Sequence, residues 1–208
     1  FMIFPVFVLY GETLEGNTPF LIGLAMGIYG LTQAALQIPF GMASDRFGRK
    51  PIITIGLIIF AIGSVVAAMS DTMTGVILGR ALQGAGAIAA AVMALTADLT
   101  REENRLGAMA TIGISIGVAF AVSLVLGPVL NQWIGVDGIF WLTGVMALAA
   151  IAVLHFVVPT PVRSSFHRDA QTVPAQLKNV LADPQLLRLD FGIFALHMML
   201  TATFVALP

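Results

Sequence analysis

Long stretches without a charged side chain alternate with short charged segments along the chain. Asp, Glu, Lys and Arg are all missing from residues 16–44, 51–70 and 106–136. A helix of about 20 mostly apolar residues crosses a bilayer, and it satisfies its own backbone hydrogen bonds within the lipid. The pattern therefore predicts an integral membrane protein whose spanning helices cover residues 1–10 (the end of a span), 20–43, 51–69, 75–97, 106–130, 138–158 and 189–208.

Composition narrows the function classes. Of the 208 residues, 58% are hydrophobic and 10% are charged, whereas roughly a quarter of the residues in a soluble domain are charged. The net charge of −1 offers no basic surface for nucleic acid. The chain has no cysteine, which excludes disulfides and cysteine-based metal or nucleophile sites. Since it also lacks phosphate-loop, dinucleotide and zinc-protease motifs, we expect a protein that is not an enzyme, binds no metal or cofactor and draws its energy from an ion gradient.

The cations are distributed asymmetrically. Nine of the ten Lys and Arg residues lie in alternate loops, and the intervening loops have none. Cytoplasmic loops of membrane proteins carry this excess. We therefore expect a multi-pass protein of the inner (plasma) membrane, with the N-terminus and the loops containing these cations in the cytoplasm: Arg46, Arg49, Lys50, Arg101, Arg105, Arg163, Arg168, Lys178 and Arg188.

A long polar segment, 159–188, separates two apolar parts. It contains apolar residues at roughly helical spacing: Val173, Leu177, Val180, Leu181 and Leu187. This spacing predicts a cytoplasmic interdomain linker with an amphipathic helix at the membrane surface; a plain spacer is the alternative. Residues 1–158 would form an N-terminal bundle, and 189–208 would begin a second one. The pattern Phe-x-x-x-Pro at 1–5 and 204–208 fits parallel six-span repeats and a chain cut within a membrane span at both ends.

The loop between the second and third spans is short and contains two glycines. Gly41 and Gly48 permit a close backbone approach or a positive φ. Asp45 and Arg49 stand four residues apart and would pair if the turn stayed helical. An ordinary basic turn on the cytoplasmic side is the alternative.

One cation falls inside a predicted span. Arg80, Gln83, Gly84 and Ala87 are spaced so that all four share one face of a helix. A cation within the membrane costs at least about 2.5 kcal/mol unless it faces a cavity or a partner. We therefore expect Arg80 to point into the helix bundle, either in a functional role or as a structural residue bonded to backbone carbonyls.

These segments resemble conserved motifs of the major facilitator superfamily. Residues 41–50 resemble its motif A, glycine-x-x-x-aspartate-arginine-x-glycine-arginine-lysine, at every key position, and residues 80–87 resemble its motif B. The antiporter signature, motif C, is present only in part. Gly127 and Pro128 match its core, but Ser123, Asn131 and Gln132 stand where glycines are usual, while Gly113 and Gly117 offer a small-residue face for helix packing. The resemblance to the superfamily covers the whole chain, and among its branches residues 84–95, 98–101 and 204–208 are most similar to a group of drug:proton antiporters.

The resemblance implies an all-α membrane fold, the six-helix N-terminal bundle of a twelve-helix transporter built from two six-helix pseudo-repeats. The implied function is secondary active transport by alternating access: proton-coupled efflux, by antiport, of drugs or other small amphipathic compounds. A proton-coupled symporter for sugars or metabolites is one alternative, and a non-transporting membrane sensor or scaffold is another. The expected partners are a small-molecule substrate, protons and the lipid bilayer, and the expected state is a monomer.

The resemblance also implies roles for individual residues. In motif A, Asp45 would face the N-terminal end of a helix in the other half of the transporter, and Arg49 would link Asp45 to Asp98, forming a cytoplasmic gate. The remaining gate residues would be Gly41, Arg46, Gly48 and Lys50. In motif B, Arg80, with Gln83 and Gly84, would assist proton coupling.

Four further polar residues are candidates for lining a cavity. They are uncharged or weakly basic side chains within the predicted spans: Tyr29, Gln33, Gln37 and His197. Gln33 and Gln37 share one helix face and would either line a cavity or bond to neighbouring helices. His197 titrates near neutral pH in its unperturbed state, although a histidine among Ala, Leu and Met is more often a packing residue.

Overall fold

The computed structural model describes residues 1–160 and 182–206, and it is all-helical apart from turns and one isolated bridge within this part of the chain. Five of its helical segments are long and apolar enough to cross a membrane. The helices are α1 (Phe7–Thr13), α2 (Pro19–Phe47), α3 (Arg49–Ala68), α4 (Met73–Ala85), α5 (Ala89–Leu99), the short 3₁₀ helix η1 (Glu102–Asn104), α6 (Arg105–Phe156) and α8 (Pro184–Ala206). The fold is therefore that of an all-α integral membrane protein.

Local chemistry explains where the first long helices begin and end. Thr18 caps α2 by accepting a hydrogen bond from the Leu21 N–H at 3.2 Å, and Thr72 caps α4 in the same way. Gly48 has a φ of 95°, a value that favours glycine because it has no Cβ. This residue ends α2 and lets α3 start immediately at Arg49.

Helix α6 contains both the fifth and the sixth expected spans. At about 1.5 Å per residue, its 52 residues are far too long for one crossing of a ~30 Å hydrocarbon layer. Its one non-helical residue is Gly135, with φ 69° and ψ 176°. The chain therefore turns at Gly135, between the two expected spans, while Pro128 lies inside the helix without breaking it.

The expected span at 75–97 falls within the apolar segment Met73–Leu99, which is long enough to cross a membrane but is not helical throughout. The structure divides this segment into α4 and α5, with residues 86–88 outside both helices. Glycine is a poor helix former, and a Cβ on Gly86 would lie 2.5 Å from the Gly56 carbonyl oxygen of α3. The close approach of α3 therefore coincides with a weak point in the helix. As a result, Ala87 lies beyond the end of α4 and is not part of the helical face of Arg80.

Two chain segments also differ from the expected bounds. Helix α1 covers Phe7–Thr13 and is preceded by turns, in a segment where Pro5 has no N–H to donate. Helix α8 begins at Pro184, five residues before the expected start, and the Asp183 carboxylate accepts from the Gln185 N–H at 2.8 Å. Leu187 therefore belongs to this helix, whereas the rest of the predicted amphipathic helix, 173–181, lies outside the described residues.

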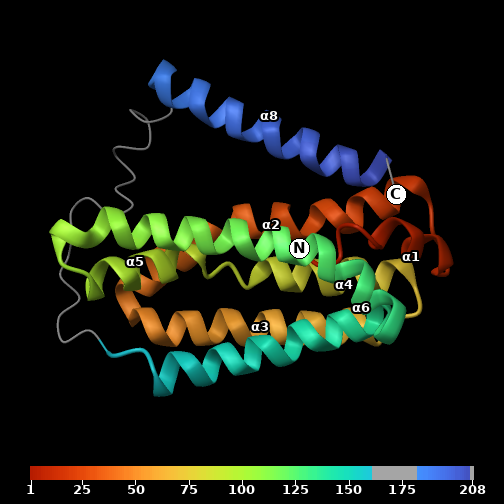
Figure 1. Cartoon of the computed structure of the whole chain (residues 1–208), viewed down its shortest axis with the longest axis horizontal. Coiled ribbons are helices and arrows are strands. Elements are labelled where there is room, and N and C mark those ends of the chain that lie inside the picture. The colour runs from red at the N-terminus through yellow and green to blue at the C-terminus, as the bar shows by residue number, and fades with distance from the viewer. Residues whose placement is uncertain (161–181, 207–208) are drawn as a thin grey trace.

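Helix α4 packs between α2 and α3, and α3 also packs against α6 (Figure 1). The contacts of α4 are backbone-close on both sides. A Cβ on Gly84 would overlap with Thr32 and with the Tyr29 carbonyl of α2, and a Cβ on Gly63 of α3 would lie 2.6 Å from the Gln83 nitrogen. In contrast, α8 (blue in Figure 1) lies to one side of the bundle, and its described side chains are mostly exposed.

The expected packing face of Gly113 and Gly117 has no neighbour within the described residues. A Cβ added to either glycine would meet nothing within 4 Å. The glycine of this part of α6 that does make a close contact is Gly127, where an added Cβ would overlap with the Met2 carbonyl. In this part of α6 the close glycine contact therefore lies against the N-terminal segment, ten residues after Gly117.

Candidate functional site

Three charged side chains meet where α2, α3 and α5 come together. Arg49 Nη1 donates a hydrogen bond to Asp45 Oδ1 and another to Ser44 Oγ at 2.8 Å, and Arg49 Nε donates to Asp98 Oδ2 at 3.1 Å. The Asp98 side chain is 2% exposed and that of Asp45 is 25% exposed. We call these four residues the charge cluster. Hydrogen bonds between ionised groups are stronger than neutral ones, so Arg49 ties three helices together.

Asp45 and Arg49 pair although the chain between them is not a continuous helix, as the prediction from their spacing had required. Helix α2 ends at Phe47, and Gly48 adopts a positive φ before α3 begins. Because no further loop residue separates the two helices, the last turn of α2 and the first turn of α3 remain adjacent. Gly48 therefore brings the two side chains together by a sharp change of direction rather than by continuing the helix.

The other residues of the motif A segment lie around the charge cluster. Gly41 faces α5, where a Cβ would lie 3.5 Å from Ala90 Cβ. Lys50 Nζ donates to the Val158 carbonyl at 2.6 Å, close to the end of α6. Arg46 is exposed and is not brought into the cluster; its guanidinium lies 5.4 Å from the centroid of the Phe47 ring.

A small cavity of about 130 Å³ adjoins the charge cluster. Asp45 and Arg49 line it together with Gln37, whose Oε1 atom is buried and accepts no hydrogen bond. Gln37, expected to line a cavity, therefore lines this one and not the larger cavities in which Gln33 lies.

A second polar group is buried between α2, α3 and α4. Arg80 Nη1 donates to Gln83 Oε1 at 2.9 Å, and Gln83 Nε2 donates to Ser64 Oγ at 2.8 Å. The guanidinium carbon of Arg80 lies 4.8 Å from the centroid of the Tyr29 ring, and its Nε lies 3.4 Å from the Ala25 carbonyl oxygen. We call Arg80, Gln83 and Ser64 the buried polar chain. Arg80 points into the bundle as its position in a span requires.

Sequence reasoning missed Ser64 and Thr143, which extend this chain into α3 and α6. Thr143 Oγ1 lies 3.4 Å from Ser64 Oγ. Both hydroxyls also bond to carbonyls of their own helices, Phe60 for Ser64 and Phe140 for Thr143. Such local bonds are common for Ser and Thr in membrane helices, so the sequence carries no signal that distinguishes these two residues.

One cavity borders the buried polar chain, and a second shares Tyr29, Gln33 and Thr143 with the first. One, of about 370 Å³, is lined by Arg80, Gln83, Thr143, Tyr29, Gln33 and Ser123 together with Phe60 and the first four residues. The other, of about 340 Å³, is lined by Tyr29, Gln33 and the segment that separates α4 from α5. Irregular backbone at membrane depth is tolerated where it lines a cavity, and the break at 86–88 meets this condition.

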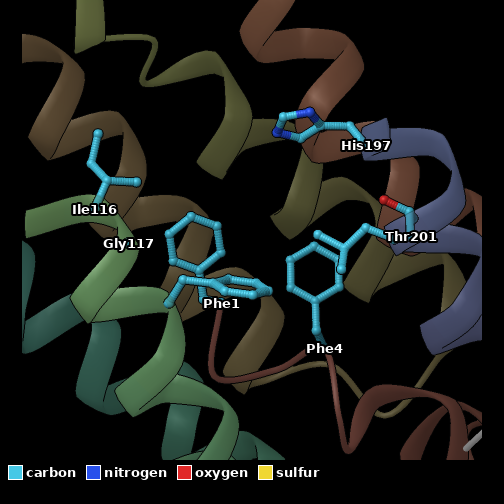
Figure 2. Close-up of a pocket in the computed structure, with 8 residues that line it drawn as sticks. Phe1, Phe4, Ile116, Gly117, His197 and Thr201 are labelled. Atoms are coloured by element: carbon cyan, nitrogen blue, oxygen red, sulfur yellow. The ribbon is translucent and has the colours of Figure 1, made fainter. Parts of the chain in front are cut away.

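A third cavity, of about 260 Å³, has a mainly apolar lining: Phe1, Phe4, Ile116, Gly117, Phe120, His197, Leu200 and Thr201. Figure 2 shows the Phe1 and Phe4 rings in this cavity, with His197 and Thr201 on α8. The Phe1 and Phe120 rings meet edge to face with centroids 5.1 Å apart. His197 Nδ1 lies 3.0 Å from the Ile193 carbonyl oxygen of its own helix.

Phe1 and Phe4 line both this apolar cavity and the 370 Å³ cavity of Arg80. The described residues thus bring an aromatic wall and a buried cation to adjacent spaces, a combination suited to a molecule with apolar and polar parts. Within the same residues, no three His, Asp or Glu side chains converge as metal ligands would.

Comparison with known proteins agrees with this architecture. The family model of the Major Facilitator Superfamily matches residues 1–208. The inner membrane transport protein YajR of Escherichia coli (strain K12) is 54% identical over 208 residues, which are all of this chain and 46% of YajR. An uncharacterized transporter of Buchnera aphidicola subsp. Acyrthosiphon pisum is 39% identical, over 100% of this chain and 54% of its own length. A triacylglyceride transporter of Mycobacteroides abscessus is 40% identical, over 71% of this chain and 28% of its own.

The chain spans about half the length of the first two relatives. The resemblance to this superfamily, expected from the motifs at 41–50 and 80–87, is confirmed. The branch expected from residues 84–95, 98–101 and 204–208 is that of YajR, and the similarity to YajR is confirmed as well. The roles of the motif residues stay predictions.

Proposed function

This chain belongs to the Major Facilitator Superfamily, and we propose that the protein exports small amphipathic compounds in exchange for protons, by alternating access. The observation that carries this proposal is the pair of adjacent cavities that share Phe1 and Phe4. One has an aromatic, mainly apolar lining, and the other contains Arg80 and several hydroxyl and amide groups. A drug-like or lipid-like molecule has this division of apolar and polar surface.

The relatives support the substrate class. YajR is named an inner membrane transport protein, and more distant relatives are named triacylglyceride transporters. A triacylglyceride has long apolar chains and ester groups that accept hydrogen bonds. The guanidinium donors of Arg80 beside an aromatic wall fit a molecule of that general kind, so we expect export of lipophilic compounds with a hydrogen-bonding end.

The charge cluster supports a gate on the cytoplasmic side. In the proposed mechanism Arg49 holds Asp45 at the edge of the 130 Å³ cavity, where a helix of the other half of the transporter would bring its positive N-terminal end. Opening this side of the protein would break that contact, while the buried pair of Arg49 and Asp98 would keep the N-terminal bundle intact.

Arg80 is the coupling residue in this proposal. Its guanidinium lies buried beside a cavity and is held by Gln83 and Tyr29. A buried cation favours the ionised state of an acid that approaches it and opposes the binding of a second cation. Release and uptake of a proton by an acid elsewhere in the transporter would therefore depend on Arg80.

The test is transport by the full-length protein in proteoliposomes, oriented with the cytoplasmic face outward. The probes are rhodamine 6G and an NBD-labelled diacylglycerol. An exporter that exchanges its substrate for protons will accumulate a probe inside vesicles with an acidic interior and lose this uptake when the gradient is collapsed. Gradient-driven movement outward would instead indicate symport. Movement of neither probe under any gradient would contradict the proposal and favour a sensor or scaffold.

A further inference from the structure

Ser64 has a bonding arrangement that fixes the orientation of the Gln83 amide. The single hydroxyl proton of Ser64 is donated to the Phe60 carbonyl at 2.9 Å. Toward Gln83, its Oγ atom is therefore left as an acceptor, and the group that meets it at 2.8 Å is Nε2. With Nε2 directed at Ser64, the Oε1 atom of Gln83 faces Arg80 Nη1 at 2.9 Å.

Thr143 does not reverse this arrangement. Its hydroxyl proton is donated to the Phe140 carbonyl at 2.9 Å, and its contact with Ser64 Oγ is longer, at 3.4 Å. An amide turned by 180° would direct its NH₂ group at the guanidinium and its oxygen at an oxygen. Both contacts would be repulsive, because Arg has no acceptor and the Ser64 proton is already used.

Close helix packing is what allows Ser64 to reach Gln83. Gly63 directly precedes Ser64. A Cβ on Gly63 would lie 2.6 Å from the backbone nitrogen of Gln83, so α3 and α4 are nearly in backbone contact there. Ser64 and Gln83 are 0% and 2% exposed. Gln83 also borders the 370 Å³ cavity, but Ser64 lines none of the cavities described above, so the bond between them lies on the closed side of the amide.

We propose that Ser64 is a positioning residue for proton coupling: it orients Gln83 so that the amide oxygen holds the Arg80 guanidinium over the Tyr29 ring. This inference rests on the proposed coupling role of Arg80. Ser64 itself contacts neither Arg80 nor, in this mechanism, the substrate. Its effect passes through one amide group, which distinguishes it from a residue that only fills space.

The test compares Ser64→Ala with Thr54→Ala in the full-length protein. Thr54 lies on the same helix and bonds to the carbonyl four residues earlier, as Ser64 does, but among the described residues it has no second side-chain partner. Two rates are measured with the transported probe: uptake driven by a pH gradient, and probe–probe exchange at equal pH. A coupling defect lowers the first rate selectively, whereas a general loss of folded protein lowers both.

We expect Ser64→Ala to lower gradient-driven uptake about tenfold, the effect of one lost buried hydrogen bond, with exchange little changed. Thr54→Ala should leave both rates near wild type. The decisive comparison is made in a protein that already carries Gln83→Glu. A carboxylate has two equivalent oxygens, so Ser64 is not needed to direct an oxygen at Arg80. There, Ser64→Ala should add no further loss of coupling. Equal loss of both rates, or the same additional loss in the Gln83→Glu background, would overturn the inference.

A substrate-free measurement separates this inference from the proposed function. In nanodiscs containing ¹⁵N-glutamine-labelled protein, the Gln83 side-chain amide signal is identified by its loss in Gln83→Glu. Its hydrogen exchange should accelerate in Ser64→Ala and not in Thr54→Ala. Unchanged exchange in Ser64→Ala would overturn the positioning role, whereas failure of wild type to move either probe would refute the transport proposal alone.

Discussion

Lys50 Nζ donates a hydrogen bond to the Val158 carbonyl oxygen at 2.6 Å, across 108 positions in the sequence. Lys50 is the last residue of the motif A segment, and Val158 follows the end of α6, just before residues 161–181. The bond thus joins the first turn of α3 to the segment that directly follows α6. It places a cation at the negative end of a helix dipole, where a positive charge is stabilising.

Replacement of Lys50 tests the strength of this link. We expect Lys50→Met to destabilise the full-length protein by about 1–2 kcal/mol, because a charge-assisted hydrogen bond and a favourable dipole contact are both lost. The measurement is the midpoint of thermal unfolding in detergent, with Arg46→Met as the control. Arg46 is exposed and its described contact is the Phe47 ring, so an equal effect of both substitutions would contradict a specific role for Lys50.

The close approach of α2 and α4 gives a second prediction. A Cβ on Gly84 would overlap with the Tyr29 carbonyl and with Thr32, so Gly84→Ala requires the two helices to separate. Overpacking of this kind costs about 1–3 kcal/mol. The matched control is Gly107→Ala, since a Cβ on Gly107 would meet nothing within 4 Å. Thermal unfolding should separate the two variants, and a Gly84→Ala protein as stable as wild type would show that this packing is looser than described.

Much of the charge cluster could be predicted from sequence, partly from spacing and partly from the family motif. Uncharged stretches defined the spans, the spacing of Asp45 and Arg49 suggested that they pair, and the resemblance to motif A implied the link from Arg49 to Asp98. The reason for the Asp45–Arg49 pairing was nevertheless different from the one assumed. A positive φ at Gly48, not a continued helix, brings Asp45 and Arg49 together. Spacing predicted the partners, and only the backbone conformation revealed how they meet.

The buried polar chain was predicted only in part, for a physical reason. Arg80 attracts notice because a cation in lipid is costly, and Gln83 follows from its place one helical turn away. Ser64 and Thr143 are ordinary helix residues until α3, α4 and α6 pack, so their contacts depend on tertiary structure alone. The break at 86–88 was missed for the same reason: it coincides with the close approach of Gly56, which is distant in sequence.

The two acids of the charge cluster should behave differently when they are neutralised. Asp98 is 2% exposed and pairs with Arg49, so Asp98→Asn should destabilise the protein by about 2 kcal/mol, the cost of a lost charged hydrogen bond. Asp45 is 25% exposed and borders the 130 Å³ cavity. We expect Asp45→Asn to change the thermal midpoint little and to impair gradient-driven uptake. Full transport by Asp45→Asn would refute the gate.

The last prediction concerns Arg80 and separates the effect of its guanidinium geometry from the effect of its positive charge. Its guanidinium donates to Gln83 and lies over the Tyr29 ring, while its Nε approaches the Ala25 carbonyl. The single ammonium group of a lysine cannot make these three contacts in the same geometry. We therefore expect Arg80→Lys, like Arg80→Ala, to lose gradient-driven uptake of the probe, although lysine retains the positive charge. The measurement is the initial rate of uptake at equal amounts of reconstituted protein, with exchange at equal pH as the reference. A wild-type rate and proton stoichiometry in Arg80→Lys would mean that any cation suffices at this position, and the orientation of the guanidinium by Gln83 would then have no part in coupling.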